Sequence, residues 1–444
     1  MERGIKRRHL VAGLATAAAM ALLLSGCSGS AGENASTENV EISFLTHWGP
    51  DQVKQLNDAA AAFKKEHPNV TVKVQAVPFG NLLSTLRTQG SSPNGPTIAS
   101  IYDLWLPELI RDGIAAKAPE SVQADVSSNW PASLVESDSA DGSLYGIPNE
   151  IDLYQLNYNK KLFADAGVSA PPTTFDELAA DAKKLTNKAA GVQGLGVITN
   201  WASGAVHPFL SLAASNNGYL LNDDHNKAAL TSPNVQAVAD LYAQLIKDGS
   251  VDASMSAANA NTTGPYLDNF VNGKTAMIIM ANWWESALKD SMGDNFKNVA
   301  TAPIPVGPDG DKSSSISYSW LTIVNAKAND AKQKAAWDFL SFLNGPESGK
   351  AGSSAMGDIL IGMGILPSRS SDIEAHSSEL SDPFLKSYVD ELSNATPFPL
   401  FIGGDAASSA LQKHVEALIF GQESPGDAME KAAAEVDGAI AAGK

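Results

Sequence analysis

The sequence predicts an α/β protein in which helices cover a parallel or mixed β-sheet. Residues 40–45 and 70–77 alternate between apolar and polar side chains, as half-buried strands do. The chain between them places Val53, Leu56 and Phe63 on one helical face. Strand and helix keep alternating further along, which is typical of sheets covered by helices. The 444 residues exceed what one hydrophobic core supports, so we expect two large lobes or about three smaller domains.

The first predicted elements place polar and aromatic residues at the ends of strands. A helix begins at Asp51 and ends before Pro68, because proline cannot continue it. A short helix over 82–89 follows the second strand, and a third strand over 96–103 leads into a helical stretch over 104–113. Ligands gather at the carboxyl ends of strands in such sheets. The residues at or just after these ends are His47, Trp48, Phe79, Tyr102, Asp103 and Trp105.

The next predicted strand carries two carboxylates. The stretch YGIPNEIDLYQLNYNKKLF, residues 145–163, has the pattern of a strand that leads into a helix, yet Glu150 and Asp152 lie inside its apolar run. A charged group in a buried strand is costly unless something compensates it. Being two residues apart, both side chains point to the same side of the strand, at roughly 7 Å spacing. We therefore treat this strand as a candidate functional element.

The remaining elements continue the α/β pattern. Thr174 and Glu177 form the sequence of a capping box at a helix start, and Pro233 lies at the start of another helix. No internal repeat and no proline-rich or serine-rich linker divides the body, so we expect the chain to cross between lobes more than once. The later predicted segments are strands over 273–280 and 316–324 and helices over 331–343, 406–421 and 425–442.

The amino-terminus has the layout of an export signal. A basic segment precedes an apolar stretch of 14 residues, which is too short to span a membrane. Leu24-Ser25-Gly26-Cys27 then resembles a bacterial lipobox, and Cys27 is the only cysteine of the chain. We expect a signal peptide over 1–26, lipidation of Cys27 and a flexible linker over 27–39. The alternative is an ordinary secretion signal with an incidental cysteine.

Charge and motif content exclude several function classes. The net charge is −18, and the first 26 residues contribute +3, so the rest of the chain carries −21 and is unsuited to nucleic acid. No pair of the seven histidines has zinc-ligand spacing, so we expect no metal. Gly273-Lys274-Thr275 is not a phosphate-binding loop, because Asp268 replaces the glycine such a loop requires. We expect no cofactor.

Aromatic residues beside polar groups give the chain its clearest indication of a ligand. Flat rings next to carboxylates and amides suit a carbohydrate, whose C–H faces stack on rings and whose hydroxyls form hydrogen bonds. The alternative for any single ring is a place in the core. The residues with this setting are Trp48, Trp105, Trp201, Trp283, Trp284 and Trp320, the last beside Tyr318.

The chain resembles the extracellular solute-binding proteins of sugar ABC transporters, the group related to maltose-binding protein. The stretch over 146–178 carries the G-I-P, Y-N-K-x-L-F, A-G and P-P-x-T-F-x-E-L elements of that family, and FVNGKTAMIIMANWW, APIPVGPDG and GILPSRSS follow in order. The resemblance implies a two-lobed class II periplasmic-binding-protein-like α/β fold with hinge crossovers. Lobe 1 would hold 40–148 and 307–345, and lobe 2 would hold 149–306 and 346–444. The lipobox suits a Gram-positive member.

The resemblance also implies binding residues in the cleft between the lobes. Asp152 matches the carboxylate that bonds sugar hydroxyls in the family, and Trp283 matches the stacking tryptophan. Arg369 is a further candidate, with a structural salt bridge or a surface position as alternatives. The family's acidic-basic pair is not reproduced in the first-lobe loop. The full candidate set is His47, Trp48, Tyr102, Asp103, Trp105, Glu150, Asp152, Trp201, Trp283, Trp284, Tyr318, Trp320 and Arg369.

The expected function is capture of a neutral sugar or oligosaccharide and its delivery to a membrane permease. We expect a monomer that is lipid-anchored to the outer face of the cell membrane and is not an enzyme. One alternative keeps the fold but binds glycerol phosphate, a peptide or a polyamine. A phosphate would need a basic cluster, of which the candidate loops show little. A less favoured alternative is a glycoside hydrolase that uses two carboxylates.

Overall fold

The computed structural model describes residues 38–258 and 264–444. The predicted signal peptide, Cys27 and nearly all of the predicted linker lie outside the described residues. Within the described ranges, no helix is both long enough and apolar enough to cross a membrane. Residues 39–444 form one compact unit, to which the following description applies.

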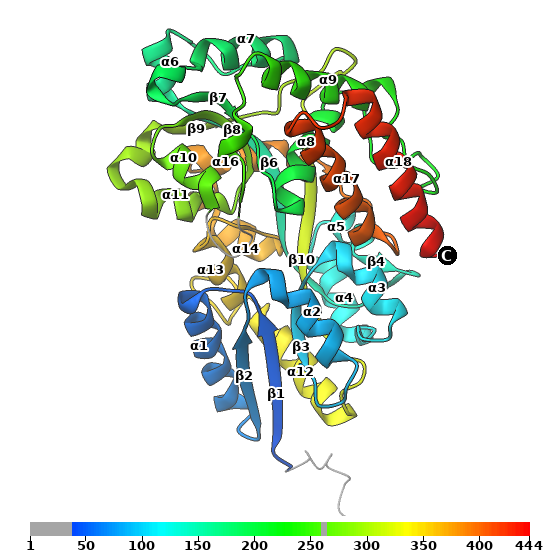
Figure 1. Cartoon of the computed structure of the whole chain (residues 1–444). Coiled ribbons are helices and arrows are strands. Elements are labelled where there is room, and N and C mark those ends of the chain that lie inside the picture. The colour runs from blue at the N-terminus through cyan, green and yellow to red at the C-terminus, as the bar shows by residue number, and fades with distance from the viewer. Residues whose placement is uncertain (1–37, 259–263) are drawn as a thin grey trace, which may run out of the picture. The chain divides into compact units, whose positions relative to one another are not determined.

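A mixed sheet organises this unit, as predicted (Figure 1). Its strands follow the order β2-β1-β3-β10-β6-β8-β7. β1 pairs in parallel with β2 and β3, whereas β10 is antiparallel to both β3 and β6. The strands on this path are β1 (Val40–Thr46), β2 (Val70–Ala76), β3 (Ile98–Tyr102), β6 (Ile147–Asn159), β7 (Gln193–Gly196), β8 (Thr275–Ala281) and β10 (Ile316–Val324).

β6 is the strand that joins two groups of strands. Its first half, through Leu153, pairs with β10, and its second half, from Tyr154, pairs with β8 and with β9 (Val299–Ala302). β11 (Leu366–Pro367) pairs with β6 at Ile151 and Glu150, on the edge of β6 opposite β10. In Figure 1, β6 and β10 run lengthwise between the β1–β3 group and the β7–β9 group. This arrangement matches the hinge crossovers of the predicted two-lobed fold, while the predicted lobe boundaries stay a prediction.

Helices cover both groups of strands (Figure 1). Those of the first half are α1 (Pro50–Glu66), α2 (Phe79–Gly90), α3 (Leu106–Arg111), α4 (Glu120–Asn129), α5 (Ala132–Ser137), α6 (Lys160–Ala166), α7 (Phe175–Leu185), α8 (Ala202–Ala214) and α9 (Pro233–Lys247). Those of the second half are α10 (Gly264–Val271), α11 (Trp284–Met292), α12 (Asp330–Leu343), α13 (Ala355–Ile361), α14 (Ser370–Ala375), α15 (Ser377–Leu380), α16 (Pro383–Glu391), α17 (Gly404–Ile419) and α18 (Pro425–Ala442). Two short pairings complete the strands, β4 (Ser139–Ala140) with β5 (Ser143–Leu144), and β12 (Thr396–Pro397) with β10.

Local signals in the sequence account for several helix starts. Thr174 caps α7 by accepting a hydrogen bond from the Glu177 amide at 3.2 Å, as predicted. The Glu177 carboxylate bonds the Thr173 amide at 2.7 Å, one residue before the position a capping box uses. Pro233 occupies the first turn of α9, where its missing N–H costs nothing.

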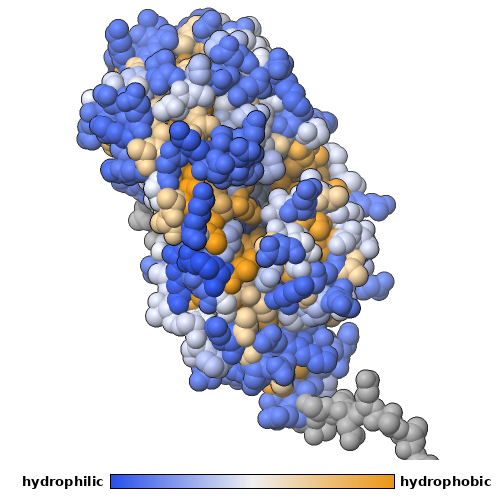
Figure 2. Space-filling view, turned by 90° about the vertical axis from the view of Figure 1, so that its right-hand side faces the viewer, coloured by the Kyte–Doolittle hydropathy of each residue, from blue (hydrophilic) through white to orange (hydrophobic). Residues whose placement is uncertain are grey.

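Hydrophobic packing secures each group of strands. Phe44 of β1, Phe63 of α1 and Phe339 of α12 are fully buried together, with Phe63 and Phe339 rings 5.3 Å apart. Around β8, the buried Phe270 and Trp284 pack with ring centroids 5.5 Å apart. The surface in Figure 2 is largely hydrophilic, in keeping with the charge of the chain, and hydrophobic residues gather near the middle of that face.

Candidate functional site

A cavity of about 370 Å³ lies where the ends of β1 and β3 meet the joining strands β6 and β10. Residues of both groups of strands line it. Some follow β1 and β3, and others lie at the starts of α8 and α11, which cover the other group. Its volume falls in the range of ordinary small-molecule sites. The cavity is lined by His47, Trp48, Gln52, Phe79, Tyr102, Glu150, Asp152, Trp201, Ser203, Trp283, Ser286, Tyr318, Trp320, Met363 and Ile365.

The two carboxylates of β6 face this cavity. Asp152 lies opposite Tyr318 and Glu150 lies opposite Trp320 in the antiparallel ladder with β10. Residues two apart on a strand share a face, so the two cross-strand pairs present four side chains to one side of the sheet. The register shifts directly after Trp320, where the ladder is irregular. The charged residues in an apolar strand are therefore explained by the cavity they line.

Asp152 is held in place by an amide. Its side chain is 1% exposed, and the Asn282 Nδ2 donates to its Oδ1 at 2.7 Å. The Oδ1 of Asn282 in turn accepts the Leu153 amide at 3.0 Å, which fixes the orientation of the side chain. Burial raises the pKa of Asp152 to about 7, although hydrogen bonds from Asn282 and Glu150 oppose that rise. Asn282 follows β8 directly, so one amide ties the end of β8 to the middle of β6.

Glu150 and Asp152 form a coupled pair. Glu150 is 4% exposed, and burial raises its pKa well above the ordinary value. The negative charge of Asp152 and the hydrogen bond between the two carboxyls raise it further. Glu150 is accordingly the protonated partner, which donates to Asp152. The pair shares a proton at neutral pH, as two buried carboxyls in contact must.

Aromatic rings form two walls of the cavity. On the first wall, His47 and Trp320 pack with centroids 4.3 Å apart, and Phe79 packs at 5.7 Å from His47. On the second wall, Trp201 and Trp283 pack edge to face at 5.7 Å. The Trp283 Nε1 donates to the Tyr318 hydroxyl at 2.7 Å, which links the second wall to β10.

The histidines near the cavity are neutral. Burial lowers the pKa of His47 to about 4, and no described residue bonds its Nδ1. His207 of α8 lies behind the wall, where burial lowers its pKa to about 3. Its Nε2 lies 3.0 Å from the Tyr102 hydroxyl and supports that ring from outside the cavity. Among the described residues that line the cavity, none is lysine or arginine.

Nine of the predicted site residues line the cavity and four do not. Asp103 is 4% exposed and accepts the Ser319 amide at 2.7 Å on the opposite face of β10, away from the cavity. Trp105 lies behind the wall, 5.8 Å from the ring of Trp320. Trp284 is 1% exposed and packs in the core around β8. The nine residues in the lining are His47, Trp48, Tyr102, Glu150, Asp152, Trp201, Trp283, Tyr318 and Trp320.

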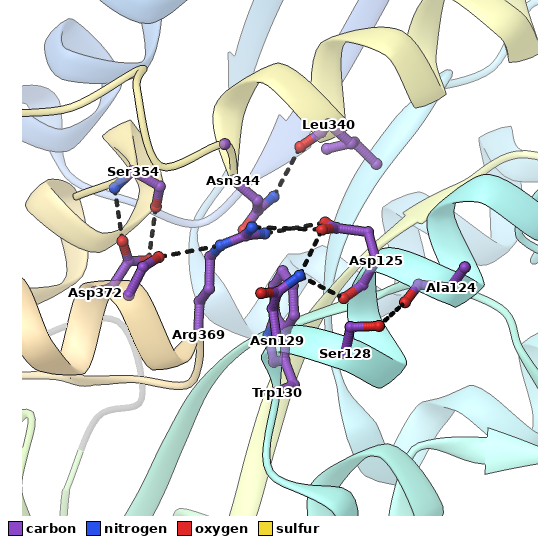
Figure 3. A network of polar contacts seen from close by, with 12 residues as sticks. Ala124, Asp125, Ser128, Asn129, Trp130, Leu340, Asn344, Ser354, Arg369 and Asp372 are labelled. Carbon is purple, nitrogen blue, oxygen red and sulfur yellow. Dashed lines mark hydrogen bonds and ion pairs between the residues drawn. The ribbon is translucent and has the colours of Figure 1, made fainter. Parts of the chain in front are cut away.

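Arg369 forms a structural salt bridge, which is one of the alternatives to ligand binding that the sequence left open for it. Its Nη1 forms a salt bridge with Asp125 at 3.0 Å, and its guanidinium lies 4.7 Å from the centre of the Trp130 ring. Figure 3 shows Arg369 directed toward Asp125 on α4, and it does not line the cavity. The salt bridge joins the start of α14 to α4, two elements far apart in the sequence.

Several lining residues were not in the predicted candidate set. Phe79 was noted just after a predicted strand, where ligands gather, yet its apolar side chain gave no reason to separate it from the core. Ser203 and Ser286 lie in the first turns of α8 and α11, soon after Trp201 and Trp283. Their position after strand ends is the one signal that would have found them. Gln52, Met363 and Ile365 carried no such signal. In the described ranges, no cluster of three or more potential metal ligands occurs.

Comparison with known proteins places this chain among binding proteins. A family model described as bacterial extracellular solute-binding protein matches residues 49–350. A putative binding protein of Brucella abortus is 28% identical over 331 residues, covering 73% of this chain and 75% of that protein. The diacetylchitobiose binding protein DasA of Streptomyces coelicolor is 25% identical over 342 residues, covering 75% of this chain and 77% of that protein. The crystal structure of the cyclic α-maltosyl-1,6-maltose binding protein from Arthrobacter globiformis shares the fold, with a TM-score of 0.72 at 23% identity, over 91% of this chain and 100% of that one.

Proposed function

The chain belongs to the bacterial extracellular solute-binding protein family, and we propose that it captures a sugar or oligosaccharide for an ABC importer. The ligand is held in the cavity between the two groups of strands and is passed to the membrane permease. The likeness to DasA and to a galactooligosaccharide-binding protein of Bacillus subtilis supports a sugar as the ligand class.

The observation that carries this proposal is the pairing of aromatic walls with hydrogen-bonding groups in one cavity. Trp283 and Trp201 offer flat faces for the C–H side of a sugar ring. Asp152 and Glu150, on the face of β6 that lines the cavity, offer carboxyl oxygens that can accept hydrogen bonds from the sugar hydroxyls. Asp152 and Trp283 are the principal contacts in this proposal, and the other seven lining residues named from the sequence complete the set.

The joining strands support a hinge. β6 and β10 pass between the two groups of strands, the short β11 pairs with β6 there, and the cavity draws residues from both groups. In this proposal lobe 1 comprises 40–148 and 307–345, lobe 2 comprises 149–306 and 346–444, and the lobes close on the ligand by a hinge motion. The closed form is the one that docks on the permease.

The amino-terminal sequence supports a place outside the cytoplasm. In this proposal residues 1–26 are removed, Cys27 carries the lipid anchor, and residues 27–39 tether a monomeric body to the outer face of a Gram-positive membrane. Two acyl chains on one cysteine give a stable anchor, whereas a single chain does not.

The alternatives receive less support from the cavity. A glycoside hydrolase needs two carboxyls about 5 to 9.5 Å apart, with the sugar bond between them. Glu150 and Asp152 are instead hydrogen-bonded to each other, which leaves no room for a bond to be cleaved between them. A phosphate ligand would require a basic group, and none of the described lining residues is lysine or arginine.

Calorimetric titration against a panel of mono- and oligosaccharides tests the proposal. We expect at least one sugar to bind with a Kd well below about 1 mM, a threshold equivalent to about 4 kcal/mol. The sugar recovered after long incubation should be chemically unchanged. If no sugar passes this threshold while a peptide or a polyamine does, the sugar assignment is wrong. Cleavage of the recovered sugar would contradict the non-enzymatic role.

A further inference from the structure

The cavity places two buried carboxyls in contact, and none of the described residues that line it is lysine or arginine. We propose that it selects a sugar that carries a protonated amino group and seats this group against Glu150 and Asp152. This inference rests on the proposed function and narrows it, since the sequence alone led us to expect a neutral sugar.

Among the described residues around the pair, none supplies a counter-charge. The titratable groups that face it come from four strands or the residue directly after them, and none is cationic at neutral pH. Burial lowers the pKa of His47, and it raises the pKa of Tyr318 and Tyr102 well above the ordinary value, so all three are neutral. These groups are His47 after β1, Tyr102 of β3, Tyr154 of β6 and Tyr318 of β10, while the acids Asp103 and Asp138 lie on the opposite face of β10, beside Ser319.

Three basic groups outside the cavity lining are engaged with other acids. Arg369 pairs with Asp125, and Arg87 pairs with Glu108. Lys289 of α11 pairs with Glu285 at 2.8 Å, outside the cavity lining. The negative charge on the Glu150–Asp152 pair is therefore left for the ligand to neutralise, because a buried charge is costly without an opposite charge nearby.

The aromatic walls favour the same sign of charge. The faces of tryptophan and tyrosine rings attract cations within about 6 Å, and the attraction grows when water is excluded. Trp283, Trp320 and Tyr318 border the cavity on the sides next to the carboxyls. An ammonium group also brings three N–H donors to two carboxyls that are rich in acceptors. A carboxylate on the ligand would meet repulsion from the same groups.

A proton and an ammonium group compete for this pair. Burial raises the pKa of Asp152 to about 7, so below that pH the pair gains a second proton and loses its negative charge. We expect the affinity for an amino sugar to rise as the pH is raised from 5 to 7.5, whereas the affinity for a matching neutral sugar changes less over that range.

Matched sugars that differ in one substituent test the inference on the unaltered protein. Cellobiose, the glucosamine disaccharide and N,N′-diacetylchitobiose share one β-1,4-linked skeleton and carry hydroxyl, amino and acetamido groups. Galactose, galactosamine and galacturonic acid provide a second series. In the series that binds, calorimetry at pH 7.5 should show the amino sugar binding at least about tenfold more tightly than the hydroxyl sugar. The acidic sugar should not bind.

Variants that each remove one carboxyl test whether Glu150 and Asp152 cause the preference for the amino sugar. Asp152→Asn and Glu150→Gln keep the shape of each side chain, and each should reduce the preference for the amino sugar to less than about threefold. Asp138→Asn is the control, because Asp138 is fully buried but bonds Ser319 on the far face of β10 at 2.7 Å. It should keep the tenfold preference.

The outcomes separate this inference from the proposed function. Equal or weaker binding of the amino sugar in every series that binds overturns the charge preference and leaves the sugar-binding role intact. Tighter binding of a linear polyamine than of any amino sugar overturns the sugar assignment while upholding a cationic ligand. Binding of no sugar in either series or in the wider panel counts against both.

Discussion

The side-chain amide of Asn282 donates to Asp152 at 2.7 Å and accepts the Leu153 amide at 3.0 Å. One residue directly after β8 thus orients the Asp152 carboxylate in the middle of β6 and also accepts a backbone N–H of that strand. β6 joins the two groups of strands. This one amide therefore contributes both to the position of Asp152 in the cavity and to holding β6 next to the end of β8. Its removal should affect both stability and the carboxyl pair.

Asn282→Ala should therefore destabilise the protein. It leaves the Leu153 N–H and an oxygen of Asp152 without a partner in a buried place, a loss of about 1–3 kcal/mol in the free energy of unfolding. Denaturant unfolding measures this change. The exposed Asn57→Ala is the matched control, since its amide bonds Val53 at the surface, and it should cost less than about 0.5 kcal/mol. Equal losses in both variants would contradict the role assigned to Asn282.

The adjacent tryptophans should behave differently when truncated. Trp283→Ala removes a wall of the cavity and should weaken sugar binding by about 1–3 kcal/mol. Trp284→Ala empties a core position that is 1% exposed and should lower the free energy of unfolding by about 3–5 kcal/mol. Calorimetry and denaturant unfolding on both variants check the contrast. Unchanged sugar affinity in Trp283→Ala would remove this ring from the site.

Asp152→Ala should weaken binding of the sugar by about 1–3 kcal/mol, because the hydroxyl or amino group it contacts is left without a partner in a buried place. Calorimetric titration with the tightest sugar from the panel measures the effect. Glu416→Ala is a suitable control, since this carboxylate bonds the Asn200 amide outside the cavity. Wild-type affinity in Asp152→Ala would refute the site.

Stability should depend on pH through the same carboxylate. Burial raises the pKa of Asp152 from 3.8 to about 7, so the folded state keeps a proton that the unfolded chain releases. The stabilisation is fully present below about pH 4 and is lost as the pH rises through 7, at up to about 1.4 kcal/mol per pH unit for one proton. Unfolding at pH 4.5, 6 and 7.5 should show a shallower decline for Asp152→Asn. Equal slopes in wild type and Asp152→Asn would contradict this assignment.

Arg369→Met should change stability and leave the ligand alone. The substitution keeps an apolar stem but removes the salt bridge to Asp125 and the charge over the Trp130 ring. Because Arg369 is only 6% exposed, we expect a loss of about 1–3 kcal/mol in the free energy of unfolding. Sugar affinity should stay within about twofold of wild type. A large loss of sugar affinity with normal stability would instead indicate that Arg369 contacts the ligand.

The strand and helix order followed from the sequence because it depends on local patterns. Alternation over 40–45, a proline at the end of α1 and a capping threonine at α7 each act within a few residues. The position of Asp152 was likewise indicated by the sequence, since a carboxylate in an apolar strand is improbable without a function.

Only the tertiary structure decided which candidate residues line the cavity and which lie elsewhere. Trp283 and Trp284 are neighbours with the same side chain, yet Trp283, just before α11, lines the cavity and Trp284, the first residue of α11, packs in the core. Arg369 finds its partner 244 residues away in α4, a pairing that no local pattern encodes. The protonation of Glu150 likewise depends on burial and on Asp152 together. Side-chain direction, distant partners and burial are properties of the packed chain, and for that reason only the fold decided them.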